Sequence, residues 1–299
     1  MDRTCFNKYL RRFPPYSKGA ALSLPAAVRR TVDAAFLPAG RDGVARSWLE
    51  SSISSAEPGA ARFVHYYRTE DGLGRAGRAR TWAAAYLRFL NMLEELNGGR
   101  GGFSLPRAAG VGKALSGRLE KHSAVIVSAE WLPGKEGFSK ATVYVAMEHP
   151  IGRAAAADLA YVSGGDAAWL CGASARDMGL FAADFYPDGG VDFKVYRRYL
   201  AGSAPLDAAA VRMAARLKRS AGFISVHRAY KFDRAEKKMF LDKTHFNLSE
   251  GVALAALSGG AGVGVKKALS LFRTRAQDLS RITCVGIRPG GRYFEIYFA

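Results

Sequence analysis

Five stretches of the chain share one pattern: a strand, a turn, and a second strand that carries an aromatic residue near its end. The stretches cover residues 48–68, 124–147, 179–200, 222–246 and 282–299. Their turns are rich in Pro, Gly and Asp, as β-hairpins require. Hairpins that recur about every 50 residues constrain the fold more than any single motif does.

Helical patterns separate the hairpins, at 78–96, 151–177, 205–220 and from 248 onward. The element order is therefore helix–strand–strand–helix, repeated five times. Closing such hairpins into a barrel removes exposed sheet edges. We predict an α+β fold in which about ten antiparallel strands form a barrel inside a ring of α-helices. The whole of 1–299 forms a single domain in this prediction.

Period-two alternation divides the strands into an apolar and a polar face. In residues 189–198, GGVDFKVYRR, Phe193 and Val195 alternate with Lys194, Tyr196 and Arg198. A helix ring would cover the apolar face, and the other face would line the lumen. A half-buried sheet with its polar face in water is the alternative, but the recurring pair of a cation and an aromatic favours a lined lumen. The expected lumen residues are Lys140, Thr142, Tyr144, Lys194, Tyr196, Arg198, Lys238, Phe240, Asp242, Glu295 and Tyr297.

The composition indicates a globular protein with an anionic partner. The chain has 299 residues, 49% of them hydrophobic, and a net charge of +18. Arg-rich codon usage accounts equally well for the overall charge, but not for cations on particular strand faces. No apolar run approaches the ~20 residues of a membrane span. The N-terminal residues resemble no signal peptide, so we expect a cytoplasmic protein without a membrane partner.

Several motifs for phosphate, metal or nucleophilic chemistry are absent from the sequence. The glycine-rich segments at 110–114 and 259–267 depart from the P-loop pattern. The five histidines form no metal-ligand pair, and the three cysteines form neither a disulfide framework nor a zinc pattern. No Asp-rich D-D-x-x-D is present, so Lys and Arg must bind any diphosphate directly. We expect no metal site on the protein.

The repeats and several blocks resemble the aromatic prenyltransferase (ABBA) barrel. The blocks are WLESS followed by AARF, then AVIVSAEWLP, SKATVYVAMEHP, MGLFAADFYPDGGVDFKVY and the C-terminal EIYF. Within that group the chain is most similar to the peptide prenyltransferases of cyanobactin biosynthesis. The resemblance implies an enzyme that transfers a prenyl group from its diphosphate to a ribosomal peptide.

The resemblance also implies roles for individual residues. Glu50 corresponds to the acid that takes the proton from the acceptor. The residues that correspond to diphosphate-binding cations are Arg62, Lys140, Lys194, Arg198 and Lys238. The residues that correspond to the aromatic shield and donor pocket are Tyr66, Tyr144, Tyr196, Phe240, Tyr297, Phe223 and Ile224. The sequence departs from the family at Thr142 and Phe240, where tyrosines are expected.

These roles predict the reaction and its partners. Cations stabilise the diphosphate that leaves, and aromatic faces stabilise the allyl cation and exclude water. Mg²⁺ is carried on the diphosphate. We expect a C5 dimethylallyl donor, a peptide acceptor, a monomer and no nucleic acid. Two alternatives stay open: a barrel of this type that prenylates a small aromatic metabolite, and a non-catalytic basic barrel that binds RNA or an anionic metabolite.

Overall fold

The computed structural model describes residues 44–55, 60–67, 123–131, 139–147, 178–188, 190–200, 204–220, 223–233, 235–236, 238–249, 282–291 and 293–298. Ten strands lie in these ranges: β1 Val44–Ser54, β2 Ala60–Tyr67, β3 Ser123–Trp131, β4 Lys140–Met147, β5 Met178–Phe185, β6 Val191–Leu200, β7 Phe223–Asp233, β8 Lys238–Leu248, β9 Ile282–Ile287 and β10 Phe294–Phe298. The helix α7 spans Ala208–Ser220, and the 3₁₀ turn η4 spans Pro289–Gly291.

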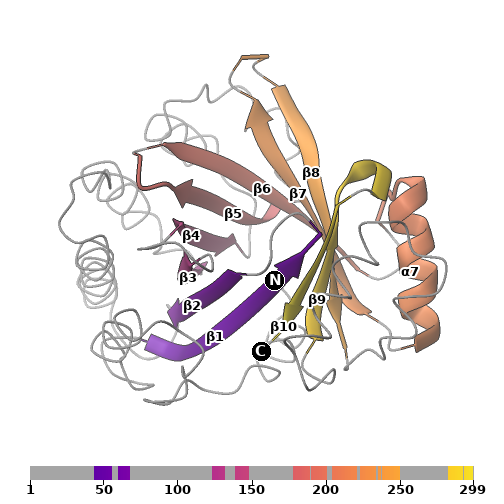
Figure 1. The fold of residues 1–299 in the computed structure, drawn as a ribbon, viewed down its shortest axis with the longest axis horizontal. Helices are drawn as coiled ribbons and strands as arrows, with labels where there is room; N and C mark the ends of the chain where they lie inside the picture. The colour runs from indigo at the N-terminus through magenta and orange to yellow at the C-terminus, as the bar shows by residue number, and fades with distance from the viewer. Residues whose placement is uncertain are drawn as a thin grey trace.

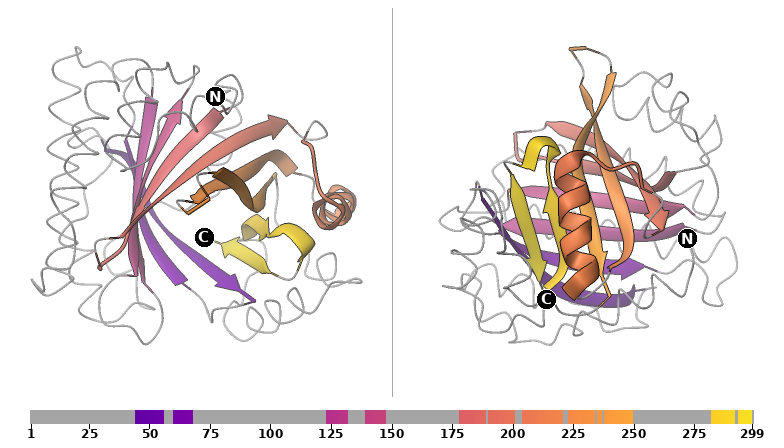
Figure 2. Two further views of the ribbon diagram at one scale, coloured as in Figure 1. Left: turned by 90° about the horizontal axis from the view of Figure 1, so that it is seen from above. Right: turned by 90° about the vertical axis from the view of Figure 1, so that its right-hand side faces the viewer.

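All five predicted hairpins are confirmed, as β1–β2, β3–β4, β5–β6, β7–β8 and β9–β10. Every neighbouring pair is antiparallel, and the hydrogen-bonding order closes on itself because β1 pairs with both β2 and β10. Figures 1 and 2 show the resulting sheet, which is strongly curled. Successive strands run in opposite directions, so the strand ends that are joined within each hairpin all lie at the same end of the curled sheet. We call this the hairpin end.

The predicted helix at 205–220 is confirmed as α7. Its first turn is capped by Asp207, whose Oδ1 accepts a hydrogen bond from the Ala210 amide at 2.9 Å. The other predicted helices, and with them the expected helix ring, lie outside the described residues; Leu248 itself ends β8. Within the described part of the chain, no helix is both long and apolar enough to cross a membrane.

The main core lies between α7 and the outer face of β7–β10, as the right panel of Figure 2 shows. Met213 and Leu217 project from α7 one turn apart, as an amphipathic helix requires. They pack in one cluster with Phe294 and Ile296 of β10, which are both fully buried. The prediction that these β10 residues face outward under a helix is therefore confirmed.

The hairpin β9–β10 turns through glycines in the left-handed region. Gly290 and Gly291 have φ values of 78° and 71°, which residues with a Cβ adopt only with strain. The turn is closed by the Arg288 amide, which donates to the Tyr293 carbonyl at 3.2 Å. The RPGG sequence thus brings Arg288 and Tyr293 together at the hairpin end of the sheet.

A β-bulge in β8 changes which residues face the lumen. On β7, Ala229 pairs with Lys243, but the next residue, Tyr230, pairs with Leu241, so Asp242 is the extra residue. The inward face of β8 therefore moves from even to odd residue numbers, and Lys243 and His245 point inward. Simple alternation from Phe240 predicts the opposite, because it assumes an unbroken period of two.

Candidate active site

Charged side chains form a band near the hairpin end of the lumen. In this ionic band, Asp184 on β5 accepts a hydrogen bond from Thr142 Oγ1 at 2.7 Å and another from Lys194 Nζ. Lys140 Nζ lies 4.0 Å from the same carboxylate and 3.5 Å from Glu130 Oε1. Two of the predicted diphosphate ligands, Lys140 and Lys194, are therefore brought together, with a buried carboxylate between them.

The charges in this cluster are stabilised by one another. Burial alone would raise the pKa of the Asp184 carboxyl, but the ammonium groups of Lys194 and Lys140 and the bond from Thr142 hold it well below its ordinary value. Burial alone would lower the pKa of Lys194, but Asp184 raises it above its ordinary value. Asp184 and Lys194 are therefore both charged near neutral pH.

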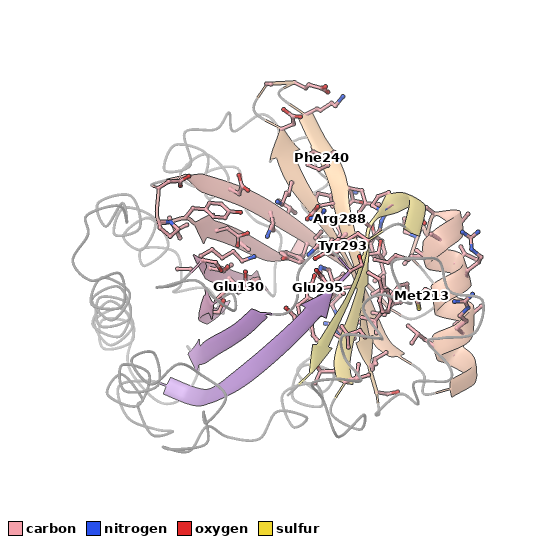
Figure 3. The ribbon with its side chains drawn as sticks, in the orientation of Figure 1. Glu130, Met213, Phe240, Arg288, Tyr293 and Glu295 are labelled. Atoms are coloured by element: carbon pink, nitrogen blue, oxygen red, sulfur yellow. The ribbon has the colours of Figure 1, made fainter. Side chains whose placement is uncertain are left out.

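A second ionic group lies across the lumen, on β8 and β10. Lys243 Nζ contacts Glu295 Oε2 at 2.6 Å, and the Tyr297 hydroxyl donates to the same oxygen at 2.7 Å. Lys243 also lies 4.9 Å from the ring centre of Tyr293, over which the Arg288 guanidinium stacks at 4.2 Å. Figure 3 shows Arg288, Tyr293 and Glu295 in succession from the hairpin end inward. Sequence analysis missed Lys243, because the bulge that turns it inward leaves no local signal.

The ionic band is balanced in charge among the described residues. Each of its cations lies within 4.0 Å of a carboxylate. The cations are Lys140, Lys194, Lys231, Lys243 and Arg288, and the carboxylates are Glu130, Asp184, Asp192, Asp242 and Glu295. The sequence predicted cations whose partner is the ligand; the structure instead gives these lysines carboxylate partners within the protein.

A row of aromatic rings lies next to the ionic band. Ring centres are 6.2 Å apart between Tyr144 and Tyr196, 6.0 Å between Tyr196 and His245, and 5.7 Å between His245 and Tyr297. We call these four residues the aromatic row. On three strands an aromatic follows its charged neighbour by two positions, which places it about 7 Å deeper on the same face. The pairs are Lys194 and Tyr196, Lys243 and His245, and Glu295 and Tyr297.

His245 is a member of the row that the sequence did not assign to the site. Burial, together with the Lys243 ammonium, lowers the pKa of His245 to about 3, so the ring is neutral at physiological pH. It faces Gly286 on β9, where a Cβ atom would come within 3.5 Å of both His245 Nδ1 and the Tyr297 ring. At that distance a Cβ would make ordinary van der Waals contact, so Gly286 lies directly against both rings.

Deeper in the lumen lies Arg198, which is separated from Lys194 by Tyr196. Arg198 pairs in register with His227, whose buried Nε2 has no hydrogen-bond partner among the described residues. Burial, together with Arg198, lowers the pKa of His227 to about 4. Arg198 and Lys194 therefore flank the aromatic row along β6 instead of forming one cluster.

Two predicted lumen residues lie at the exposed end of the β7–β8 hairpin. Lys238 forms an ion pair with Glu236 in the same turn, and its side chain is 64% exposed. Phe240 is 41% exposed and lies well away from Glu295 in Figure 3. Phe240 pairs in register with Lys231 at the edge of the ionic band, and Lys238 pairs with Asp233 farther out. Neither residue joins the aromatic row, because the hairpin extends beyond the rest of the sheet (Figure 1).

The remaining predicted residues have described backbones only. Glu50 pairs with Arg62, and Arg62 pairs with Glu130, so these positions continue the row that holds Lys140. Tyr66 pairs with Ile126, which pairs with Tyr144 of the aromatic row. Phe223 and Ile224 begin β7, at the end of that strand opposite its hairpin turn. Their side chains lie outside the described residues.

Comparison with solved structures gives the fold. The 5-dimethylallyltryptophan synthase of Streptomyces coelicolor superposes with a TM-score of 0.54 at 14% identity, covering 99% of this chain and 96% of that one. Prenyltransferase PriB, bound to L-tryptophan and dimethylallyl thiolodiphosphate, gives 0.54 at 14% identity over 99% and 95%. The chain has the fold of these aromatic prenyltransferases. The resemblance drawn from the sequence is thus confirmed at the level of fold.

A 6-dimethylallyl tryptophan synthase is similar to the same degree, with a TM-score of 0.54 at 15% identity over 99% of this chain and 94% of that one. No protein-family model matches the sequence. No curated protein gives a significant match. At these identities the chains share the prenyltransferase fold. The similarity does not assign a role to any residue in the lumen of this chain.

Proposed function

We propose that the chain is a prenyltransferase that moves a C5 dimethylallyl group from its diphosphate to an acceptor inside a complete helix-wrapped barrel. The observation that carries this proposal is the aromatic row lying next to lysines in one lumen. Allylic transfer separates an anionic leaving group from a carbocation, so it needs cations and aromatic faces side by side. Solved structures of the same fold hold DMASPP with tryptophan or dimethylallyl thiolodiphosphate with L-tryptophan, which supports the proposal.

In this proposal, Lys140 and Lys194 bind the diphosphate. Each ammonium group has three N–H donors, so an ion pair with Asp184 does not use them all. Ionisation of the C–O bond leaves the electron pair on the diphosphate, whose added charge the ammonium groups stabilise. A preorganised cation in a buried lumen stabilises this charge far better than water does. Arg62 is a further candidate for the same anion because its backbone continues the row that holds Lys140. Arg198 lies on the other side of Tyr196, and only the resemblance to the family makes it a candidate.

The aromatic row would wall in the allyl cation. Each desolvated cation–π contact contributes about 2 kcal/mol, and the rings also exclude the water that would capture the cation. His245 can serve in this wall because its ring is neutral; a protonated imidazole would repel the cation. The wall would thus be formed by Tyr144, Tyr196, His245 and Tyr297.

The proton lost from the acceptor needs a base, and we propose Glu50. Its backbone lies on β1, four residues from Ser54, which pairs with Glu295 of the ionic band. Glu295 itself is bound by Lys243 and Tyr297, which stabilise its carboxylate and make it the weaker candidate. General-base catalysis by one positioned carboxylate is usually worth about 10²–10⁴-fold.

Magnesium enters the proposal as a counter-ion of the diphosphate. In the described part of the chain, no group of three or more His, Cys, Asp or Glu side chains is arranged to hold a metal. The carboxylates of the ionic band each have a cation within 4.0 Å, which does not fit a dedicated metal cage. In this proposal Mg²⁺ would therefore enter and leave with the diphosphate.

For the acceptor we propose an aromatic ring, presented by a small metabolite or by a peptide. The similar structures that hold tryptophan favour the small aromatic. The resemblance to the cyanobactin enzymes favours a peptide, which would enter at the hairpin end, beside Phe240. We further propose a cytoplasmic monomer. The apolar outer face buried under α7 does not favour an RNA-binding barrel, which stacks bases on exposed sheet faces.

The test is to incubate the protein with Mg²⁺, dimethylallyl or geranyl diphosphate, and either small aromatics including tryptophan or a mixed peptide pool. Intact-mass analysis should find an acceptor that has gained one C5 unit. The pool that yields product identifies the acceptor class. Recovery of all donor unchanged, without even the alcohol that water would form from the cation, would contradict the proposed function.

A further inference from the structure

Asp184 lies behind two lysines of the ionic band, Lys140 and Lys194. The carboxylate side chain is 1% exposed, whereas Lys194 and Lys140 retain 12% and 19%. The carboxylate is anchored on its far oxygen by Thr142, and its near oxygen faces both ammonium groups. The lysines, not the carboxylate, are therefore the groups that a molecule in the lumen meets first.

The ammonium groups of Lys140 and Lys194 can stay near each other only with an anion between them. Without it, their mutual repulsion in a low-dielectric lumen would drive the two flexible side chains apart. Both lysines approach the same oxygen, Asp184 Oδ2. Glu130 Oε1 also lies 3.5 Å from Lys140 Nζ, so the two lysines and two carboxylates sum to zero, and Asp184 is the carboxylate that both lysines share.

We propose that Asp184 is a positioning residue that holds Lys140 and Lys194 together as a preformed site for a diphosphate. The identity of the anion rests on the proposed function. Asp184 itself does not touch the ligand in this proposal; it acts through the lysines. Asp184 is also a poor candidate for the base, because its carboxylate is buried and already accepts a hydrogen bond from Thr142.

Asp192 provides a matched control. It pairs directly with Asp184 in the β5–β6 register, so it lies on the same face and carries the same charge. Its contacts are different, because it accepts a hydrogen bond from the Tyr186 hydroxyl at 3.0 Å and lies 3.6 Å from Lys231 Nζ. Asp184→Asn and Asp192→Asn therefore change the lumen charge equally, while only the first removes the carboxylate that Lys140 and Lys194 share.

The experiment is titration calorimetry of the full chain with inorganic pyrophosphate, from pH 7 to pH 10. Asp184→Asn should weaken pyrophosphate binding on the order of 10-fold, the size seen when groups that orient a ligand set are removed. Asp192→Asn should give a clearly smaller loss. Asp184→Asn should also lose affinity at a lower pH than the wild type, because Asp184 raises the pKa of Lys194. A role in folding alone would not move this pH profile.

Equal or tighter pyrophosphate binding by Asp184→Asn, with an unmoved pH profile, would overturn the proposal. If that variant does not fold, Thr142→Val decides, since it removes the anchor and keeps every charge: weaker binding supports the proposal and unchanged binding overturns it. If the wild type transfers a prenyl group but Asp184→Asn binds pyrophosphate as tightly as the wild type, the positioning role alone is overturned. Weakened binding in Asp184→Asn, beside a wild type that transfers no prenyl group, would overturn the proposed function alone.

Discussion

The rings of Tyr196 and His245 lie 6.0 Å apart and come from strands that are not neighbours in the sheet, β6 and β8. This contact joins the aromatic residues of one part of the sheet to Tyr297 on the other. If the joined row encloses an allyl cation, the loss of a ring in its middle should admit water to that cation.

We predict that His245→Leu slows prenyl transfer by roughly 10- to 30-fold, equivalent to about one desolvated cation–π contact. It should also raise the ratio of hydrolysed donor to prenylated acceptor. His245→Phe, which retains a neutral aromatic face, should keep that ratio near the wild-type value. Chromatography of both products from one reaction gives the measurement. An unchanged ratio in the Leu variant would remove His245 from the wall.

Glu50→Gln should leave donor binding intact and slow transfer by about 10²–10⁴-fold, because the amide keeps the size of the side chain but cannot accept a proton. Single-turnover rates at saturating donor measure the step directly. Glu295→Gln is the matched control, and its expected effect on the same rate is smaller because Glu295 is bound by Lys243 and Tyr297. The reverse order of the two effects would make Glu295 the base.

Lys194→Ala should destabilise the protein as well as weaken donor binding. A lysine whose only partner is the ligand could be removed without cost to folding. Instead, this variant leaves the buried Asp184 with Thr142 and a more distant Lys140. Breaking a buried ion pair costs about 3–5 kcal/mol. Removing both partners in Lys194→Ala/Asp184→Ala should restore part of that loss, as urea denaturation of the three variants will measure; wild-type stability of Lys194→Ala would contradict the pairing.

Acid should destabilise the fold through its buried histidines. The pKa values of His245 and His227 are about 3 and about 4 in the folded protein, against an ordinary value near 6.5. Between these values the unfolded chain binds more protons, so the free energy of unfolding should fall as the pH drops from about 6.5 toward 4. The pKa of Asp184 is also lowered, and the stability that its carboxylate contributes is lost only at still lower pH.

His245→Phe removes one of these two imidazoles and should flatten this dependence. The measurement is the melting temperature of wild type and variant at several pH values between 7 and 5. As the pH falls, the melting temperature of the wild type should drop by more than that of the variant, whatever their offset at pH 7. Parallel curves would mean that His245 is protonated in the folded state, contrary to its burial beside Lys243.

The hairpins and much of the aromatic row were predictable from sequence, because alternation and turn chemistry are local properties. Tyr144, Tyr196 and Tyr297 occupy corresponding places in their hairpins, and the structure brings all three together. Phe240 occupies the corresponding place in a fourth hairpin, but it lies on an extension beyond the rest of the sheet. Position within a repeat therefore predicted the face of a residue better than its depth in the lumen.

What the sequence by itself determined is the order of the strands and, where the alternation is unbroken, the two faces of each strand. The tertiary structure alone decided which charges meet. The bulge at Asp242 turns Lys243 and His245 inward, and no local pattern marks it. Asp184 meets Thr142, 42 residues away, and Lys243 meets Glu295, 52 residues away, only because the curled sheet sets their register. Side-chain charge is a local property, but its partner depends on cross-strand register, which is fixed only when the whole sheet pairs.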